Sequence, residues 1–181
     1  MDLTEKQISF EYKFQGKIVN LRVDDALLPN GATAKREIVE HNGGVCVAPL
    51  DNDGNLYFVK QFRYPYMEVV TELPAGKLEK GEDPFEAGKR ELKEETGAVA
   101  KKYIDLGKLY PTPGYCGEII HMYLATELEF GKQNPDEDEF LEVYKIPLGK
   151  AVEMVMNGEL RDSKTQTMIL KIHVMKQEGK I

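Results

Sequence analysis

Hydrophobic and polar residues alternate along the first forty residues, which is the pattern of strands with one covered face. Phe10, Tyr12 and Phe14 alternate with charged residues, and the stretch 34–41 alternates again. Residues 45–50 are more continuously apolar, as expected of a strand covered on both faces. The sequence Asp-Asn-Asp-Gly follows and predicts a hairpin turn into a further strand. This part of the chain is therefore predicted to form strands.

After residue 82 the pattern changes to helical spacing. Asp83 is a favourable N-cap, Pro84 suits the first helical position and Gly97 suits the C-terminus, so we predict a helix between them. Further strands are predicted at 106–110, 119–125 and 140–146, followed by two helices that contain residues 152–156 and 169–175. This order of elements indicates an α/β fold in which a mixed sheet packs between helices.

Charge and composition exclude several classes of function. The chain has 181 residues, a formal net charge of −7 and a pI near 5.1. Since a nucleic-acid binder needs a basic face for phosphates, we expect no nucleic-acid partner. The N-terminus carries no basic start followed by an apolar stretch, and no run has the length of a membrane span, so we expect neither a signal peptide nor a membrane partner. Cys46 and Cys116 are far apart, which favours reduced thiols in a cytoplasmic protein.

The most informative segment runs from Gly76 to Ala98 and has the spacing G-x5-E-x7-R-E-U-x-E-E-x-G-U, where U is an aliphatic residue. Within it, Glu91 and Glu95 share one face of the predicted helix a turn apart, with Glu94 beside them. Like charges at this spacing repel one another and weaken a helix. A bound Mg²⁺ would reverse that cost, because hard cations prefer carboxylate oxygens.

Two further features flank these glutamates. Glu82 precedes the helix and can hold Arg90 by a charge-assisted hydrogen bond. The sequence Pro74-Ala75-Gly76 precedes the loop, where a free backbone carbonyl can add another metal ligand. For an arbitrary acidic string, a solvated helix face with Lys89, Arg90 and Lys93 as surface partners would be the better interpretation. The complete spaced motif favours a metal site instead.

The motif resembles the signature of the Nudix hydrolase family and departs from it at no fixed position. Other segments are similar to the ADP-ribose pyrophosphatase branch of that family. The stretch 72–76, Glu-Leu-Pro-Ala-Gly, resembles its lead-in, and Thr112-Pro113-Gly114 followed by Glu118 looks like its S/T-P-G-x-x-x-E loop. The resemblance spans roughly residues 5–175. It implies an α/β/α sandwich of the Nudix type with a mixed sheet, preceded by a small N-terminal antiparallel sheet.

The resemblance also implies roles for individual residues. The ligands of Mg²⁺, or of Mn²⁺ in its place, would be Glu91, Glu95, Glu139 and the carbonyl of Ala75. The catalytic residues would be Glu137 as general base together with Glu94, Arg90 and Glu82. The substrate would be bound by Arg36, Arg63, Lys77, Thr112, Pro113, Gly114 and Glu118. The consecutive acidic residues 136–139 leave the identity of the base open within that run.

In function, the resemblance implies Mg²⁺-dependent hydrolysis of the pyrophosphate bond of ADP-ribose to AMP and ribose 5-phosphate. One alternative is the same chemistry on GDP-mannose, on another nucleotide sugar or on a nucleoside triphosphate. Another alternative is a domain that senses ADP-ribose without catalysis. Residues 1–40 exceed a minimal Nudix core, and the resemblance implies that they form an element exchanged between the subunits of a homodimer. Residues 41–181 would form the hydrolase domain.

Overall fold

The computed structural model describes residues 2–135 and 139–181, and the chain divides into two compact units. The first unit consists of Met1–Gly43 and Tyr110–Ile119, and the second of Gly44–Leu109 and Ile120–Ile181. The segment Tyr110–Ile119 joins the first unit by pairing Cys116 with Val39 in a parallel bridge. The sequence pattern did not indicate this addition to the N-terminal element.

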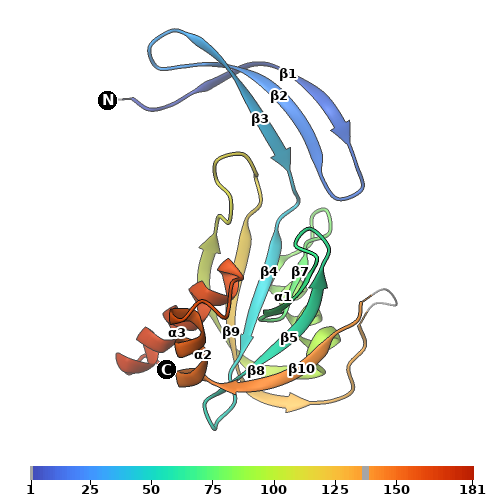
Figure 1. Ribbon diagram of the computed structural model, residues 1–181, viewed down its shortest axis with the longest axis vertical. Helices are drawn as coiled ribbons and strands as arrows, with labels where there is room; N and C mark the ends of the chain where they lie inside the picture. Colours follow the sequence, from blue (N-terminus) through green and yellow to red (C-terminus); the bar gives the residue numbers. More distant parts are fainter. Residues whose placement is uncertain (1, 136–138) are drawn as a thin grey trace. The chain divides into compact units, whose positions relative to one another are not determined.

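The first unit contains an antiparallel sheet in the order β1-β2-β3 (Figure 1). Its strands are β1 Lys6–Gln15, β2 Asn20–Leu27 and β3 Thr33–Glu40. These strands match the sequence prediction, but the predicted half-burial of β1 is wrong for the single chain. Every residue of β1 is exposed, including Phe10 at 53% and Phe14 at 58%. β1 is an edge strand, and its exposure shows that no described part of this unit covers either of its faces.

The second unit contains two sheets. A four-stranded sheet has the order β7-β4-β9-β8, with β7 Ala75–Lys77, β4 Gly44–Pro49, β9 Ile120–Phe130 and β8 Ala98–Leu109. A three-stranded sheet has the order β10-β5-β6, with β10 Glu142–Pro147, β5 Asn55–Arg63 and β6 Glu68–Glu72. β4 runs parallel to β9 and antiparallel to β7, so the larger sheet is mixed.

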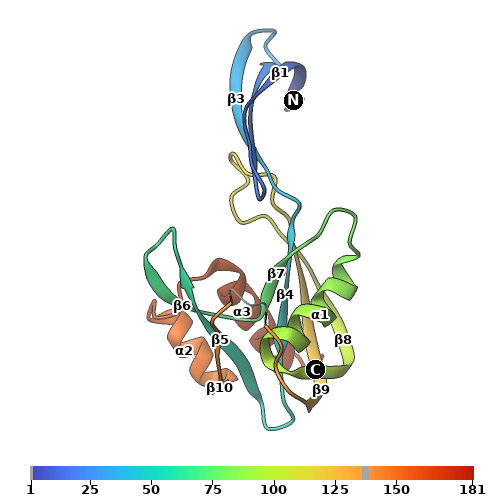
Figure 2. The same cartoon turned by 90° about the vertical axis from the view of Figure 1, so that its right-hand side faces the viewer.

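The helices are α1 Pro84–Thr96, α2 Leu148–Met156 and α3 Ser163–Gln177. α1 and α3 cover opposite faces of the four-stranded sheet, and α2 packs against α3 and against β5 and β10 of the three-stranded sheet (Figure 2). The side chains of β4 alternate between the two faces, since Val45 and Val47 pack in the cluster with α1 whereas Cys46 and Ala48 pack in the cluster with α2 and α3. The predicted α/β/α sandwich is confirmed. No helix in the described part of the chain is long and apolar enough to cross a membrane.

The ends of α1 lie where the local sequence predicts them. The Asp83 carboxylate accepts hydrogen bonds from two backbone N–H groups of the first turn, both at 3.0 Å, and Pro84 is the first helical residue. Gly97 ends the helix with φ of 73°, a left-handed conformation that costs glycine little. β8 begins at Ala98, well before the strand predicted at 106–110, because the short apolar start Ala-Val-Ala is followed by two lysines and shows no apolar alternation.

Candidate active site

Two carboxylates on α1 are buried against the β7 segment. Glu91 is 8% exposed and Glu95 is 2% exposed, one helical turn apart. The backbone N–H of Ala75 donates a hydrogen bond to Oε2 of Glu95 at 3.0 Å. At Gly76, an added Cβ would come within 1.9 Å of Oε1 of Glu91. An added side chain at Gly76 would therefore have to displace the Glu91 carboxylate, which gives a reason for the glycine of the motif.

The electrostatics of this face favour a cation. Burial raises the pKa of Glu95 to about 8; the Ala75 N–H opposes that shift, and the negative charges of Glu91 and Glu139 add to it. Burial also raises the pKa of Glu91, against the opposing charge of Arg90. The structure thus brings Glu139 close enough to influence both buried carboxylates. The buried pair Glu91 and Glu95 is only partly compensated by the positive charges of Arg90 and Arg63.

The donors match a divalent metal ion in chemistry and charge. Hard cations such as Mg²⁺ take carboxylate and backbone carbonyl oxygens, the groups that Glu91, Glu95, Glu139 and Ala75 offer. Among residues 2–135 and 139–181, no three acidic, histidine or cysteine side chains already converge as a finished metal site. These residues fit the metal in ligand type, and a bound cation would have to draw the carboxylates together.

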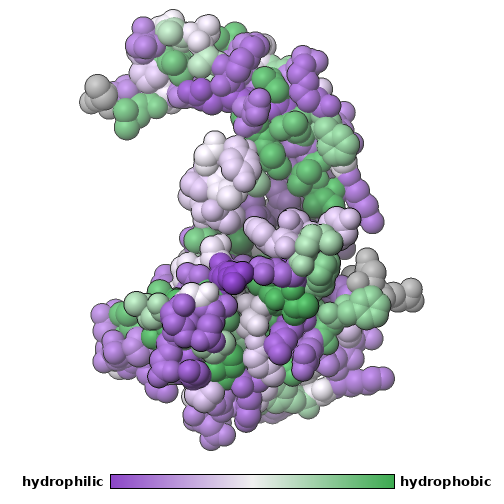
Figure 3. Space-filling model, viewed as in Figure 1, coloured by the Kyte–Doolittle hydropathy of each residue, from purple (hydrophilic) through white to green (hydrophobic). Residues whose placement is uncertain are grey.

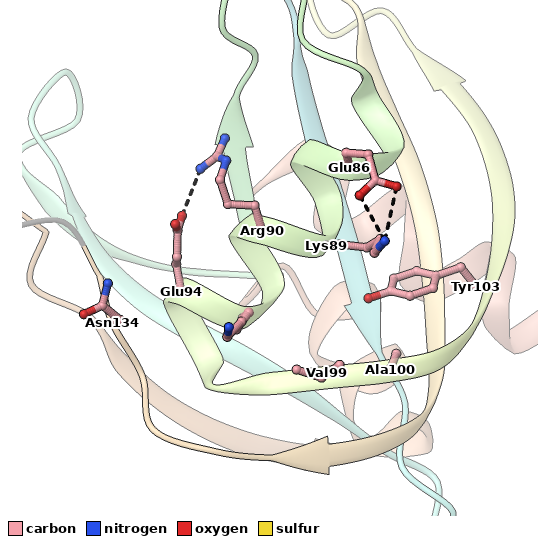
Figure 4. Close-up of a pocket in the computed structure, with 9 residues that line it drawn as sticks. Glu86, Lys89, Arg90, Glu94, Val99, Ala100, Tyr103 and Asn134 are labelled. Carbon is pink, nitrogen blue, oxygen red and sulfur yellow. Dashed lines mark hydrogen bonds and ion pairs between the residues drawn. The ribbon is translucent and has the colours of Figure 1, made fainter.

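Arg90 connects the carboxylates of α1 to the preceding loop. Its Nη1 lies 2.9 Å from Oε1 of Glu91 and 2.9 Å from Oε2 of Glu94, and its Nε lies 3.2 Å from Oε1 of Glu82. Figure 4 shows Arg90 reaching toward Glu94, beside a hollow between α1 and β8 that is lined by Tyr103 and other residues. Arg90 is therefore placed to orient the side of α1 that carries Glu91, Glu94 and Glu95, called the acidic face below. Glu82 holds Arg90 in that position.

Arg63, at the end of β5, is held by a buried carboxylate. Its Nε and Nη2 donate to the two oxygens of Glu72 at 2.6 and 2.8 Å, a bidentate pair. Burial opposes ionisation of Glu72, but Arg63 and Lys164 lower its pKa below the ordinary value. The charge of Arg63 also reaches Glu95. The structure thus places Arg63 in the surroundings of the acidic face.

The sequence analysis missed Lys164, whose ammonium contacts Glu72 from the start of α3. It is buried, which is rare for lysine. One signal was present: Asp162 is a favourable N-cap, so Lys164 falls in the first turn of a helix, where the dipole disfavours a cation. That signal is weak, since the exposed Lys150 also lies in the first turn of a helix.

The remaining predicted site residues are divided between the two units, except for one that lies outside the described residues. Lys77 is exposed at the end of β7 in the second unit. Arg36, Thr112, Pro113, Gly114 and Glu118 belong to the first unit. There, Arg36 forms an ion pair with Glu5 at 2.6 Å, and Glu118 lies 3.6 Å from Nδ1 of His41. Glu137, the predicted general base, lies outside the described residues.

Comparison with known proteins adds to this geometry. The model of the NUDIX domain matches residues 39–165. The chain is 47% identical over 165 residues to an ADP-ribose pyrophosphatase of Bacillus subtilis, covering 90% of this chain and 89% of that one. It is 44% identical over 164 residues to a methanol dehydrogenase activator of Bacillus methanolicus, covering 89% of this chain and 88% of that one.

A solved structure shares the fold. The crystal structure of an ADP compounds hydrolase superposes with a TM-score of 0.85 and covers 100% of both chains, at 21% sequence identity. At that identity the likeness concerns architecture, and it agrees with the sandwich of sheets and helices described above.

Proposed function

The chain belongs to the NUDIX domain family, and from this premise we propose that it hydrolyses the pyrophosphate bond of ADP-ribose with Mg²⁺, releasing AMP and ribose 5-phosphate. The observation that carries the proposal is the buried pair Glu91 and Glu95, held against Ala75 and Gly76 on the matched segment. Buried carboxylates with raised pKa values and no complete set of cationic partners are suited to a metal. The activity named for the Bacillus subtilis relative supports ADP-ribose as the substrate.

The metal would be held by the residues that surround the acidic face. Glu91, Glu95 and Glu139, with the Ala75 carbonyl, are the proposed ligands of Mg²⁺ or Mn²⁺. When bound, such a cation neutralises pyrophosphate charge and makes water a better nucleophile. Arg90 fixes the orientation of Glu91 and Glu94 through its ion pairs at 2.9 Å.

Other residues are assigned to accept the proton of the attacking water and to bind the phosphates. We assign Glu137 as the base that accepts the proton of the attacking water, an assignment that rests on sequence alone. Arg63 would bind a phosphate, because its bidentate pair with Glu72 uses Nε and Nη2 and leaves Nη1 for the substrate. Attack of the water oxygen on one phosphorus breaks its bond to the bridging oxygen, and the other phosphate leaves.

Recognition of the two ends of ADP-ribose is assigned to the remaining predicted residues. Arg36 and Lys77 are cations suited to phosphate or to the adenine end. Thr112, Pro113 and Gly114 form one loop with Glu118, whose carboxylate is suited to ribose hydroxyl groups. In the first unit, backbone N–H groups of Tyr115 and Cys116 donate to the Thr112 carbonyl at 3.4 and 3.1 Å, which gives this loop a defined turn.

We also propose that the protein is a homodimer in which the first unit takes part. The sheet β1-β2-β3 exposes large apolar side chains, among them Ile8, Phe10 and Phe14, and Figure 3 shows apolar surface on this unit. Exposed apolar patches on soluble proteins mark interaction sites. A second copy of the chain would cover this surface. A small nucleotide sugar would be the other partner, and a cytoplasmic location remains a prediction from the cysteine usage.

A second candidate function is activation of a dehydrogenase, favoured by the 44% identity to the methanol dehydrogenase activator. Adding the chain to purified methanol dehydrogenase tests it, with Glu95→Gln as the comparison. A rate increase that both proteins produce would indicate activation by contact alone. An increase that only the wild-type chain produces would indicate activation through hydrolysis.

The main proposal is tested with a substrate panel of ADP-ribose, GDP-mannose, ADP-glucose, NADH and deoxynucleoside triphosphates in Mg²⁺, with products separated by chromatography. We expect preferential release of AMP from ADP-ribose. Preferred turnover of another compound would keep the chemistry and replace the substrate. Tight binding of ADP-ribose with no turnover of any compound would make the chain a sensor.

A further inference from the structure

Four charged side chains join the start of α3 to the end of β6. The Lys164 ammonium contacts the carboxylate of Glu72 and lies 2.9 Å from Oδ1 of Asp162. Glu72 in turn holds Arg63 in the bidentate pair. Two cations and two anions balance one another, and Lys164 and Glu72 are 8% and 2% exposed.

Stability alone does not account for Lys164. Burying an ammonium is costly unless it is fully paired, and apolar replacements of buried ion pairs are often neutral or stabilising. Its place in the first turn of α3 is also one where the helix dipole disfavours a cation. An ammonium buried between two carboxylates fixes the positions of both of them.

Lys164 holds the start of the segment 72–75, which leads to the acidic face. Glu72 is followed by Leu73, whose N–H donates to Oγ1 of Thr165 at 2.9 Å. The next residue, Pro74, accepts a hydrogen bond from the N–H of Val47 at 2.9 Å. Ala75 then donates to Glu95 at 3.0 Å. Each of the four residues 72–75 therefore forms its own ion pair or hydrogen bond with a neighbouring element.

Two of these four contacts come from consecutive residues of α3. Lys164 fixes the Glu72 side chain, and Thr165, which is fully buried, fixes the Leu73 backbone. The first turn of α3 thus determines where the segment starts, and the segment ends on a predicted metal ligand. Through Glu72 the same turn also orients the guanidinium of Arg63.

We propose that Lys164 and Thr165 are positioning residues for the reaction. They set the segment 72–75, and through it the Ala75 backbone and the Glu95 carboxylate, in the geometry that binds the metal. Neither residue is among the proposed ligands of the metal or of the substrate. This inference rests on the proposed function, because it assigns the segment a metal-binding task.

The test measures Mn²⁺ binding to the free chain by electron paramagnetic resonance, alongside ADP-ribose hydrolysis and thermal unfolding. Lys164→Met removes the charge and keeps most of the volume. We expect its Mn²⁺ dissociation constant to rise about 10-fold, as for other residues that support metal ligands. The value of kcat should fall with it, and Lys164→Arg should recover most of both losses.

The matched control is Lys150→Met, at an exposed lysine in the first turn of α2 that pairs with Glu153 at 3.0 Å. It should leave Mn²⁺ binding and kcat unchanged. Thr165→Val, which removes only the acceptor for the Leu73 N–H, should weaken Mn²⁺ binding in the same direction. It provides the test if Lys164→Met fails to fold.

Several results would overturn the inference. Folded Lys164→Met or Thr165→Val with wild-type Mn²⁺ affinity would do so, and failure of both variants to fold would show a purely structural role. If the wild-type chain binds Mn²⁺ but does not hydrolyse ADP-ribose, the proposed function fails while the binding comparison still decides this inference. If the wild-type chain binds no Mn²⁺, that result contradicts both the proposed function and this inference.

Discussion

Gly76 lies so close to Glu91 that a Cβ on it would come within 1.9 Å of the Oε1 atom of that carboxylate. Glu91 is itself buried and paired with Arg90, so displacing its carboxylate would disturb that ion pair. The β7 segment therefore contacts α1 through the backbone of Gly76, and α1 contacts β7 through the carboxylate of Glu91. This contact brings the Ala75 backbone to Glu95.

Replacing Gly76 by alanine tests this contact. We expect Gly76→Ala to lower the free energy of unfolding by about 1–3 kcal/mol, as in other overpacked sites, and to reduce ADP-ribose turnover because Glu91 is displaced. Urea denaturation and initial rates are the measurements. The control is Gly149→Ala in α2, where an added Cβ meets no atom within 4 Å, and the gain should be about 0.5–1 kcal/mol. Wild-type stability and turnover in Gly76→Ala would contradict the described contact.

Metal addition should stabilise the fold, because a cation relieves the repulsion among Glu91, Glu95 and Glu139. At a Mg²⁺ concentration 100 times the dissociation constant, the gain is about 2.7 kcal/mol. For a chain of this length that corresponds to a rise in Tm of roughly 5–11 °C. Differential scanning calorimetry with Mg²⁺ and then with excess EDTA measures it. A Tm that does not respond to Mg²⁺ or Mn²⁺ would argue against a metal on this face.

Arg63→Lys tests whether the guanidinium geometry matters beyond its charge. Lysine keeps the positive charge but cannot form the bidentate pair with Glu72 while also meeting a phosphate. We expect KM for ADP-ribose to rise about 10-fold, the loss of roughly one charge-assisted hydrogen bond. Steady-state kinetics provide the measurement. Arg161→Lys is the control, since the exposed Arg161 pairs with Glu68 at 3.1 Å and its replacement should leave KM unaltered. An equal KM in both variants would remove Arg63 from the substrate site.

Light scattering tests the proposed dimer. We expect a mass of twice the 20.5 kDa chain for the wild type at micromolar concentration. Phe10→Ser combined with Phe14→Ser should shift the mass toward the monomer, since both side chains are more than half exposed in the single chain. Val174→Ser, at an exposed position on α3, is the matched control and should remain dimeric. A monomeric wild-type chain would contradict the proposal.

Local signals predicted much of this structure correctly. Asp83 and Gly97 marked the ends of α1 because a cap and a left-handed residue act within one helical turn. The continuous apolar run of β4 indicated a strand covered on both faces, and its residues do pack alternately with α1 and with α2 and α3. The spacing of Glu91 and Glu95 placed both on one helix face, and both are buried there.

What the sequence did not reveal depends on contacts between distant segments. Lys164 and Glu72 are separated by 92 positions, and no local sequence pattern near either residue indicates that their side chains are in contact. The joining of Tyr110–Ile119 to the first unit depends on pairing with β3. The alternation in β1 correctly indicated a strand, but periodicity does not say which molecule covers its apolar side chains.

Hydrolysis of ADP-ribose at the Glu91 and Glu95 carboxylates of α1 is tested most directly by comparing AMP release by the wild-type chain and by Glu95→Gln at saturating Mg²⁺. The exposed Glu86, which pairs with Lys89 on the same helix, supplies the control variant Glu86→Gln. We predict rapid AMP release by the wild type and the control, and a fall of about 100-fold in Glu95→Gln, whose circular dichroism spectrum should match the wild type. AMP release by Glu95→Gln at a rate near that of the wild type would contradict the account.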